Sequence, residues 1–254
     1  MPKQIAFGRR AVAELLETGF DVTEIFFLAS GSGEIFIKLK STAETKGIRM
    51  ISSSRTELDR ITDSGNHQGI AAYYLQPRML DIVELLDQIS QDFPRPVIII
   101  DGVEDPRNLG AIIRSAEVLG AGGIVLRKDR SAGITPLTVK ASAGAAMWLP
   151  TALATNLSRT IDIMKKNGYW IYGLDSTGKD VIWDIDLIGK IGIVVGNEEK
   201  GISRLVKQRC DHLVRIPQLG KVASLNVSVS ASLALSEWLR KNVKKLSKGL
   251  IYGL

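Results

Sequence analysis

The first residues that could do chemistry are Asn108, Gly110 and Arg114, at the start of a predicted helix, Leu109–Leu119. Asn108 is well suited to cap this helix at its amino terminus. At about 100° per residue, Gly110 and Arg114 fall on one flank, away from the apolar face. The guanidinium would therefore project outward over a residue that has no side chain. The alternative is a solvated arginine paired with Glu117, three positions along the helix.

A second segment that could contact a ligand is Gly196–Ser203, which follows the apolar run Ile191–Val195 and precedes a predicted helix. Gly196 and Gly201 permit a close backbone approach or a positive φ angle. A buried strand that ends in glycine, with the acid Glu198 close behind, favours a pocket in which the main chain contacts a flat ligand. A charged surface turn is the alternative.

The third segment, Ile216–Ala231, leads into a helix that the sequence predicts from Ser224 to about Lys245. Ser224 is suited to cap this helix. Ser and Ala fill its first turns, where most helices carry long side chains, so the helix can pack closely against neighbouring backbone. We expect this packing whatever else the segment does.

Two glycine-containing motifs argue against nucleotide cofactors. Gly173–Asp180 is close to a phosphate-binding P-loop, but Asp180 stands where a Ser or Thr should hold magnesium, and a carboxylate there would repel a triphosphate. Gly120–Gly123 ends a predicted helix instead of following a strand, which differs from the dinucleotide fingerprint. Binding of a nucleoside triphosphate or a dinucleotide is therefore not expected. Composition leaves a Ser-His-Asp triad open, but neither histidine, His67 or His212, stands near a nucleophile elbow.

The elements that must position the three segments form a predicted α/β domain, residues 96–254. Short apolar runs alternate with helical segments, which is typical of parallel strands joined by crossover helices. The predicted strands are Val97–Val103, Ile124–Leu126, Trp170–Gly173, Ile191–Val195 and Leu213–Ile216. Such a sheet binds ligands at the carboxyl ends of its strands, where the three segments lie.

Residues 1–76 have the pattern of a smaller α/β domain, because their hydrophobic period switches between those of helix and strand. Residues 77–95 are expected to be a linker with one amphipathic helix, Asp81–Gln88. The predicted elements of the small domain are helices Arg10–Glu17 and Glu34–Thr45, strands Glu24–Leu28, Ile48–Ser52 and Gly69–Leu75, and a short helix after Ser54.

Composition sets the broad class of the protein. Of 254 residues, 45% are hydrophobic and 24% are charged, as in a soluble globular protein. One cysteine, Cys210, excludes an internal disulfide, and two histidines with one thiol make a poor zinc site, so no metal is expected. The net charge of +6 favours an anionic partner, nucleic acid before membrane. No apolar run approaches the ~20 residues that span a bilayer, so we expect a cytoplasmic protein.

Together and in this order, the three segments resemble the signature of the SpoU (TrmH-type) RNA 2′-O-ribose methyltransferases of the SPOUT superfamily. The resemblance covers the whole chain. The family patterns N-x-G-x-x-x-R, G-x-E-x-x-G and S-L-N-x-S are matched by Asn108, Gly110 and Arg114, by Gly196, Glu198 and Gly201, and by Ser224, Leu225, Asn226 and Ser228.

The amino-terminal domain is similar to the ribosomal-protein-like RNA-binding domain of the subfamily that methylates a guanosine in 23S rRNA, the RlmB type. The similarity rests on Gly8 before two arginines and on His67-Gln68-Gly69 near the end of the domain. It implies RNA binding by Arg9, Arg10, His67 and Gln68. Basic residues near the carboxyl terminus suit an RNA partner or form a solvated end: Arg240, Lys241, Lys244, Lys245 and Lys248.

The resemblance also implies a fold and a cofactor. The family folds as a parallel sheet whose carboxy-terminal segment forms a trefoil knot, and it works as a homodimer. S-adenosylmethionine would lie against the backbone at Gly196, Ile216 and Leu225. The transfer of its sulfonium methyl group to a ribose 2′-hydroxyl would depend mainly on positioning the two reactants.

The resemblance implies roles for the remaining site residues. Arg114 is the implicated catalytic residue, and because a guanidinium stays protonated, we expect it to hold the ribose or its phosphate and to stabilise developing negative charge. Asn108 and Glu198 would orient Arg114 by hydrogen bonds. Ser224 and Asn226 would shape the third segment.

Two other functions remain open at this point. Within enzymes, the alternative is 2′-O-methylation of tRNA or of another rRNA nucleotide, since no base-reading code is visible in the sequence. Outside enzymes, the alternative is a non-catalytic RNA-binding or ribosome-assembly factor, although the intact signature residues argue against it.

Overall fold

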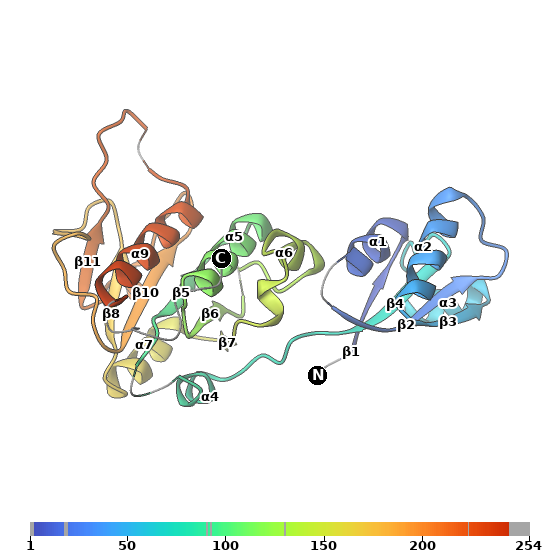
Figure 1. Ribbon diagram of the computed structural model, residues 1–254, viewed down its shortest axis with the longest axis horizontal. Helices are drawn as coiled ribbons and strands as arrows, with labels where there is room; N and C mark the ends of the chain where they lie inside the picture. Colours follow the sequence, from blue (N-terminus) through green and yellow to red (C-terminus); the bar gives the residue numbers. More distant parts are fainter. Residues whose placement is uncertain are drawn as a thin grey trace. The chain divides into compact units, whose positions relative to one another are not determined.

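The computed structural model describes residues 3–17, 20–89, 91, 93–129, 131–222 and 224–243. The chain divides into two compact units, one of Met1–Arg78 with Ile134–Met147 and the other of Met79–Gly133 with Trp148–Leu254. Each unit has its own sheet and its own buried apolar cluster. Figure 1 labels most of the helices and strands of the two units.

The amino-terminal unit is built on a sheet of four strands among the described residues, in the order β1-β4-β2-β3. The central strand β4 runs antiparallel to β1 and β2, whereas β2 and β3 are parallel. The strand β1 was not predicted from the sequence. The elements are β1 (Lys3–Phe7), α1 (Arg9–Glu17), β2 (Asp21–Leu28), α2 (Glu34–Thr45), β3 (Arg49–Ser53), α3 (Arg55–Ile61) and β4 (Ile70–Leu75).

A segment from much later in the chain completes this unit. It contains α6 (Pro136–Ala141) and the short 3₁₀ helix η1 (Ala145–Met147). Helix α6 packs against α1, and Lys140 Nζ lies 3.3 Å from Glu17 Oε2. This pairing of distant segments has no local signal in the sequence.

The carboxy-terminal unit is built on an all-parallel sheet, which confirms the predicted architecture. Within the described part of the chain its seven strands follow the order β7-β6-β5-β10-β8-β11-β9. The strands are β5 (Val97–Asp101), β6 (Gly123–Arg127), β7 (Thr151–Ala154), β8 (Trp170–Leu174), β9 (Asp180–Val181), β10 (Ile191–Gly196) and β11 (His212–Arg215).

Burial explains why the central strands were visible in the sequence. Every residue of β5 and β10 is buried, as expected for central parallel strands covered on both faces. The strands β7 and β9, which have four and two residues, lie at the two edges of the sheet and were missed.

Helices connect and cover these strands. The predicted linker helix is present as α4, which begins with a capping box between Asp81 and Glu84 and buries Leu85 and Leu86 in the core. No helix in the described ranges is long and apolar enough to cross a membrane. The helices of this unit are α4 (Ile82–Asp87), α5 (Pro106–Val118), α7 (Leu157–Lys166), α8 (Arg204–Lys207) and α9 (Val227–Asn242).

Candidate active site

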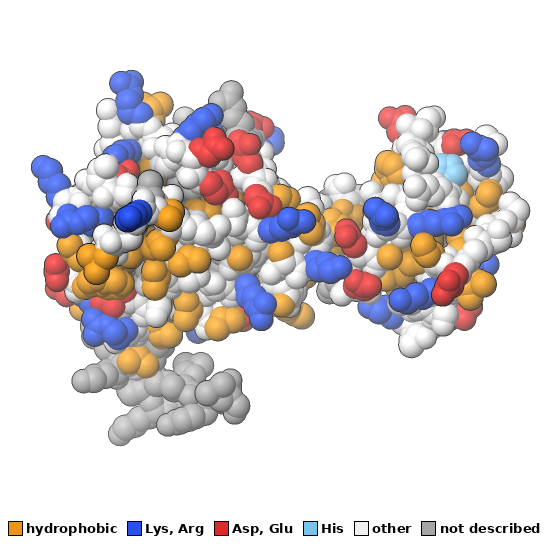
Figure 2. Space-filling view, turned by 90° about the horizontal axis from the view of Figure 1, so that it is seen from above, with side chains coloured by type: hydrophobic (Ala, Val, Ile, Leu, Met, Phe, Trp, Pro, Cys, Tyr) orange, Lys and Arg blue, Asp and Glu red, His pale blue; other side chains and the backbone are white. Residues whose placement is uncertain are grey.

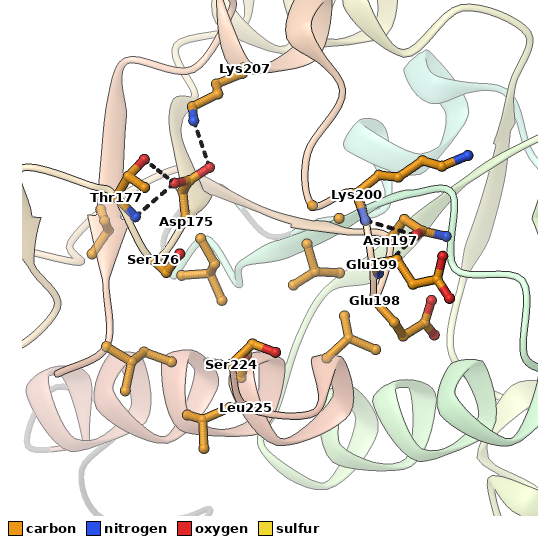
Figure 3. Close-up of a pocket in the computed structure, with 18 of the residues that line it drawn as sticks. Asp175, Ser176, Thr177, Asn197, Glu198, Glu199, Lys200, Lys207, Ser224 and Leu225 are labelled. Atoms are coloured by element: carbon orange, nitrogen blue, oxygen red, sulfur yellow. Dashed lines mark hydrogen bonds and ion pairs between the residues drawn. The ribbon is translucent and has the colours of Figure 1, made fainter. Parts of the chain in front are cut away.

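The second and third predicted segments line one cavity of about 430 Å³ at the carboxyl ends of the central strands, and the first segment is tied to them by the hydrogen bonds of Asn108 to Glu198 and Asn226. The strands β10, β8 and β11 are neighbours in the sheet, so the loops that follow them lie side by side. Figure 3 shows Glu198–Lys200 on one side of the cavity, Asp175–Thr177 on the opposite side, and Ser224 and Leu225 along a third side. Gly196 and Ile216, predicted to contact a cofactor, also line it.

A chain of hydrogen bonds joins the three signature segments. Asn108 Nδ2 donates to Glu198 Oε1 at 2.8 Å, and Asn226 Nδ2 donates to Asn108 Oδ1 at 3.0 Å. The amide of Asn108 is therefore engaged on both sides, with a donor facing Glu198 and an acceptor facing Asn226. Residues that are 90 and 118 positions apart in the chain are brought into direct contact.

The prediction that Asn108 caps its helix is wrong. Helix α5 starts earlier, with Asp105 as the cap, whose Oδ1 accepts from the backbone N–H of Arg107 at 2.9 Å, and with Pro106 in the first turn. Asn108 thus lies inside the first turn. Because its side chain is not needed for capping, it is available to bond the other two segments.

The prediction that Ser224 caps the last helix is also wrong. The cap of α9 is Asn226, whose Oδ1 accepts from the backbone N–H of Ser228 at 2.9 Å and from its hydroxyl at 2.6 Å. Ser224 instead lines the cavity. Helix α9 ends at Asn242 in the described chain, and the predicted extension to Lys245 lies outside the described residues, as do Lys244 and Lys248.

The second segment forms a tight turn that needs its glycines. A Cβ atom on Gly196 would lie 2.1 Å from the backbone carbon of Gly201, and Gly201 has a φ of +65°. Backbone bonds in both directions join Asn197 and Gly201. The Asn197 side chain accepts from Glu199 N and Lys200 N and donates to Gly102 O at 2.8 Å. Gly196 and Gly201 both line the cavity and have no side chain, so at these two positions the turn presents its main chain.

A buried carboxylate anchors this turn to the neighbouring strand. Asp101, the last residue of β5, is 3% exposed, and its Oδ2 accepts from Ser203 N at 2.7 Å. Arg127 Nη1 lies 3.6 Å from its other oxygen. These contacts satisfy a buried charge that would otherwise be costly.

One wall of the cavity was missed by the sequence analysis. The segment after β8 contributes Asp175, Ser176 and Thr177, and Lys207 of α8 reaches in above them (Figure 3). In the sequence this segment stands out only as an incomplete match to a P-loop. Its position directly after a predicted strand, at the same edge as the other three loops, was the signal that could have placed it here.

Asp175 orders this wall. Its Oδ2 lies 2.8 Å from Lys207 Nζ, and its Oδ1 accepts from the backbone N–H and hydroxyl of Thr177 at 2.9 and 2.5 Å. Burial alone would raise the pKa of Asp175, but the hydrogen bonds from Lys207 and Thr177 outweigh it and hold the pKa below its usual value. The side chain is thus ionised and fully engaged.

Arg114 is exposed on α5, as predicted. Within the described residues it forms no ion pair with Glu117 and no hydrogen bond with Asn108 or Glu198, which bond to each other. Its helix is held to α9 by a 2.8 Å hydrogen bond from Ser232 Oγ to Ser115 Oγ, and the two helices lie side by side (Figure 1). The guanidinium is therefore free to meet an incoming group.

The predicted RNA-binding residues differ in their surroundings. Arg10 and Gln68 are exposed, Arg9 is half-buried, and His67 is only 8% exposed. Arg240 and Lys241, at the end of α9, are engaged: Arg240 makes two 2.7 Å hydrogen bonds with Glu237, and Lys241 donates to the carbonyls of Trp183 and Ile185. In the described ranges, no group of three or more His, Cys, Asp or Glu side chains could hold a metal ion.

Comparisons with known proteins match both parts of the chain. The model of the SpoU rRNA Methylase family matches residues 95–236, and a model described as RNA 2′-O ribose methyltransferase substrate binding matches residues 5–80. A putative TrmH family tRNA/rRNA methyltransferase of Staphylococcus saprophyticus is 38% identical over 245 residues, which cover 95% of this chain and 97% of that protein.

A second relative matches over nearly the whole chain, and a solved structure has the same fold. The 23S rRNA (guanosine-2′-O-)-methyltransferase RlmB of Coxiella burnetii is 39% identical over 237 residues, 92% of this chain and 94% of that protein. The crystal structure of the SpoU methyltransferase AviRb from Streptomyces viridochromogenes, in complex with the cofactor AdoMet, superposes with a TM-score of 0.67. The sequences are 23% identical, and the match covers 97% of this chain and 92% of the other.

Proposed function

The chain belongs to the SpoU rRNA methylase family, and on that premise we propose that it transfers a methyl group from S-adenosylmethionine to the 2′-hydroxyl of a guanosine in 23S rRNA. The observation that carries the proposal is the hydrogen-bond chain from Glu198 through Asn108 to Asn226 at the cavity. It unites the three segments that match the family signature.

The residues that line the cavity fit the proposed cofactor. The volume of about 430 Å³ lies in the usual range for small-molecule sites. The cofactor has a flat base and carries positive charge on its sulfonium and ammonium groups. The main chain at Gly196, Ile216 and Leu225 would hold the base, and the carboxylate of Glu198 would favour the positive charge.

In this proposal the residues of the chain bind, orient and stabilise charge. The bound cofactor supplies a methyl group on a sulfonium centre, open to in-line attack by an oxygen. Arg114, which has no partner among the described residues, would bind the ribose or its phosphate and stabilise the charge that develops on the 2′-oxygen. Asn108 and Glu198 would fix the first turn of the Arg114 helix, and Asn226 and Ser224 would fix the third segment.

The choice of 23S rRNA rests on the amino-terminal domain and on the relatives. Residues 5–80 match the substrate-binding model, and the Coxiella relative named as acting on a 23S rRNA guanosine matches over nearly its full length. We assign RNA substrate binding to residues 1–76, around Arg9, Arg10, His67 and Gln68, the linker to 77–95 and methyl transfer to 96–254. The enzyme would act in the cytoplasm.

A trefoil knot and a homodimer belong to the same proposal. The knot rests on the family resemblance; the structure adds that the segments after β8 and β10 are closely packed, since a Cβ on Gly178 would lie 2.5 Å from Leu213 O and one on Gly196 would meet the backbone of Gly201. Figure 2 shows hydrophobic side chains gathered over part of the carboxy-terminal unit, and Val118 and Val229 are exposed on the neighbouring helices α5 and α9. A second copy of the chain could cover such residues.

The test is a map of 2′-O-methyl groups on the rRNA and tRNA of cells with and without the protein. The proposal predicts that one 23S rRNA guanosine loses its 2′-O-methyl group. Loss of a tRNA site alone would contradict the choice of rRNA. An unchanged map would contradict the methyltransferase proposal itself.

A further inference from the structure

A second cavity, of about 710 Å³, lies within the amino-terminal unit and shares no lining residue with the first. Its walls come from the first residue of α1, the loop after β2, the start of α3 and the loop before β4. The residues that matter below are Arg9, Arg55, Asp59, Ser64, His67 and Gln68. A cavity of this size can hold a small ligand or one unit of a polymer.

Two guanidinium groups at this cavity have no acidic partner among the described residues. Arg9 Nε donates to the backbone oxygen of Gln68 at 3.4 Å, which fixes the side chain and leaves both terminal nitrogens unpaired. Arg55 is exposed and forms neither a hydrogen bond nor an ion pair within the described ranges. Guanidinium groups with free terminal donors match the oxygens of a phosphate.

Asp59, which lines the cavity, already has a hydrogen-bond partner in His67. His67 Nδ1 accepts from the backbone N–H of Gly69 at 3.0 Å, so the ring proton is on Nε2, which donates to Asp59 Oδ1 at 3.0 Å. Asp59 alone among the lining residues carries negative charge, against two arginines. The cavity therefore has an excess of positive charge.

The loop that forms one wall is held in an unusual conformation. Asp63, Ser64 and Gln68 all have positive φ angles, between 50° and 59°, although none is glycine. Such backbone persists only where the surroundings enforce it, and it concentrates at ligand sites. Here the His67 ring clamps the loop, and Gln68 Oε1 accepts from the backbone N–H of Arg9 at 3.1 Å.

We propose that this cavity binds one nucleotide of the RNA strand, with Arg9 and Arg55 on its phosphate and with His67 and Gln68 as positioning residues that hold the loop. The inference rests on the proposed function, which supplies RNA as the partner. Figure 2 shows basic and acidic side chains interspersed over the visible face of this unit. That mixed surface does not define an anion site, whereas the two arginines at the cavity do. Ser30, Ser32, Ser64 and Asn66 at the same cavity add polar groups for the sugar or the base.

The test compares Arg55→Ala with Arg60→Ala in the full chain. Both arginines are exposed on α3, but Arg60 is not at the cavity, so each variant loses one charge from the same helix. Binding of in vitro transcribed 23S rRNA is measured by filter binding at several salt concentrations, and S-adenosylmethionine binding by calorimetry.

The proposal predicts that Arg55→Ala raises the Kd for RNA at least about fivefold and reduces the slope of log affinity against log salt by about 0.7, the value for one lost phosphate contact. Arg60→Ala should change the Kd less than about twofold. Equal effects of the two variants, or no effect of Arg55→Ala, would overturn the nucleotide site. If the wild-type protein still methylates the RNA, such a result would leave the proposed function intact. Absence of methyl transfer by the wild-type protein would instead refute the proposed function and not the binding site.

Discussion

Asn226 donates a 3.0 Å hydrogen bond to Asn108, 118 positions earlier in the chain, and Asn108 in turn donates to Glu198. The first turn of α5, the start of α9 and the turn after β10 are thus linked by one amide. Because a primary amide has a donor and an acceptor, Asn108 can serve both neighbours at once. Neither an acid nor an apolar residue at this position could do so.

Exchanging the donor and the acceptor tests this link. Asn108→Asp should destabilise the protein by about 1–2 kcal/mol and weaken cofactor binding, because a carboxylate would lose the donor and face Glu198. Adding Glu198→Gln should recover much of the lost stability, since the Gln amide can donate to the new carboxylate, which still accepts from Asn226. Thermal melts measure this recovery, and calorimetry with S-adenosylmethionine should still show weak binding, because the charge of Glu198 is gone. A double variant that is thermally no more stable than Asn108→Asp would show that the bond does not hold the site together.

Gly196→Ala should disrupt the turn that follows β10. The new Cβ would fall 2.1 Å from the carbon of Gly201, so the turn must move, and the main chain that faces the cavity moves with it. We expect a loss of about 3 kcal/mol of stability and at least about tenfold weaker cofactor binding. Gly133→Ala is the matched control, because its Cβ would meet nothing within 4 Å and its φ is not positive. Similar cofactor affinities for both variants would rule out a role of this turn in binding.

Much of the fold was accessible from the sequence because the relevant signals are local. The buried strands β5 and β10 are continuous apolar runs, and Asp81 with Glu84 marks the start of α4. The pairing of α6 with α1, in contrast, joins segments more than a hundred residues apart in the chain. Such contacts depend on packing and leave no periodic pattern.

The site was predicted in part for the same reason. The signature residues Asn108, Glu198 and Asn226 could be identified by spacing, but their bonds to one another could not. The wall at Asp175 depends on β8 lying between β10 and β11, an order set by long-range strand pairing. The error at Asn108 was local: Asp105 followed by Pro106 is itself a helix start, and it precedes the asparagine.

Arg114→Lys should separate catalysis from cofactor binding. A lysine keeps the charge but loses the planar fork of donors, so we expect kcat to fall about 10²-fold. The affinity for S-adenosylmethionine should stay within about twofold, because Arg114 is not among the residues that line the cavity. Arg60→Lys, the same exchange on an exposed residue of the other unit, should leave both quantities unchanged. Near-normal turnover of Arg114→Lys would exclude a requirement for the guanidinium.

The ion pair of Asp175 and Lys207 should make stability depend on acid pH. The pKa of Asp175 is lower in the folded protein than the ordinary value of 3.8, so its contribution to stability is present above that value and is lost as the pH falls through the folded pKa. Asp175→Asn removes this titration. The difference in Tm between wild type and Asp175→Asn should therefore be largest at about pH 5 and above and shrink at lower pH. A difference that stays constant over this range would mean that the carboxylate charge does not stabilise the wall.

The chemical position of the transferred methyl group tests the central claim most directly. Purified protein is incubated with 23S rRNA that lacks the modification and with S-adenosylmethionine carrying a tritiated methyl group, and the RNA is then hydrolysed with alkali. Alkaline cleavage requires a free 2′-hydroxyl, so a 2′-O-methyl group leaves the label in an alkali-resistant dinucleotide. The account predicts tritium in one such dinucleotide with guanosine at its 5′ side. Tritium in mononucleotides, or no transfer of label to the RNA, would contradict it.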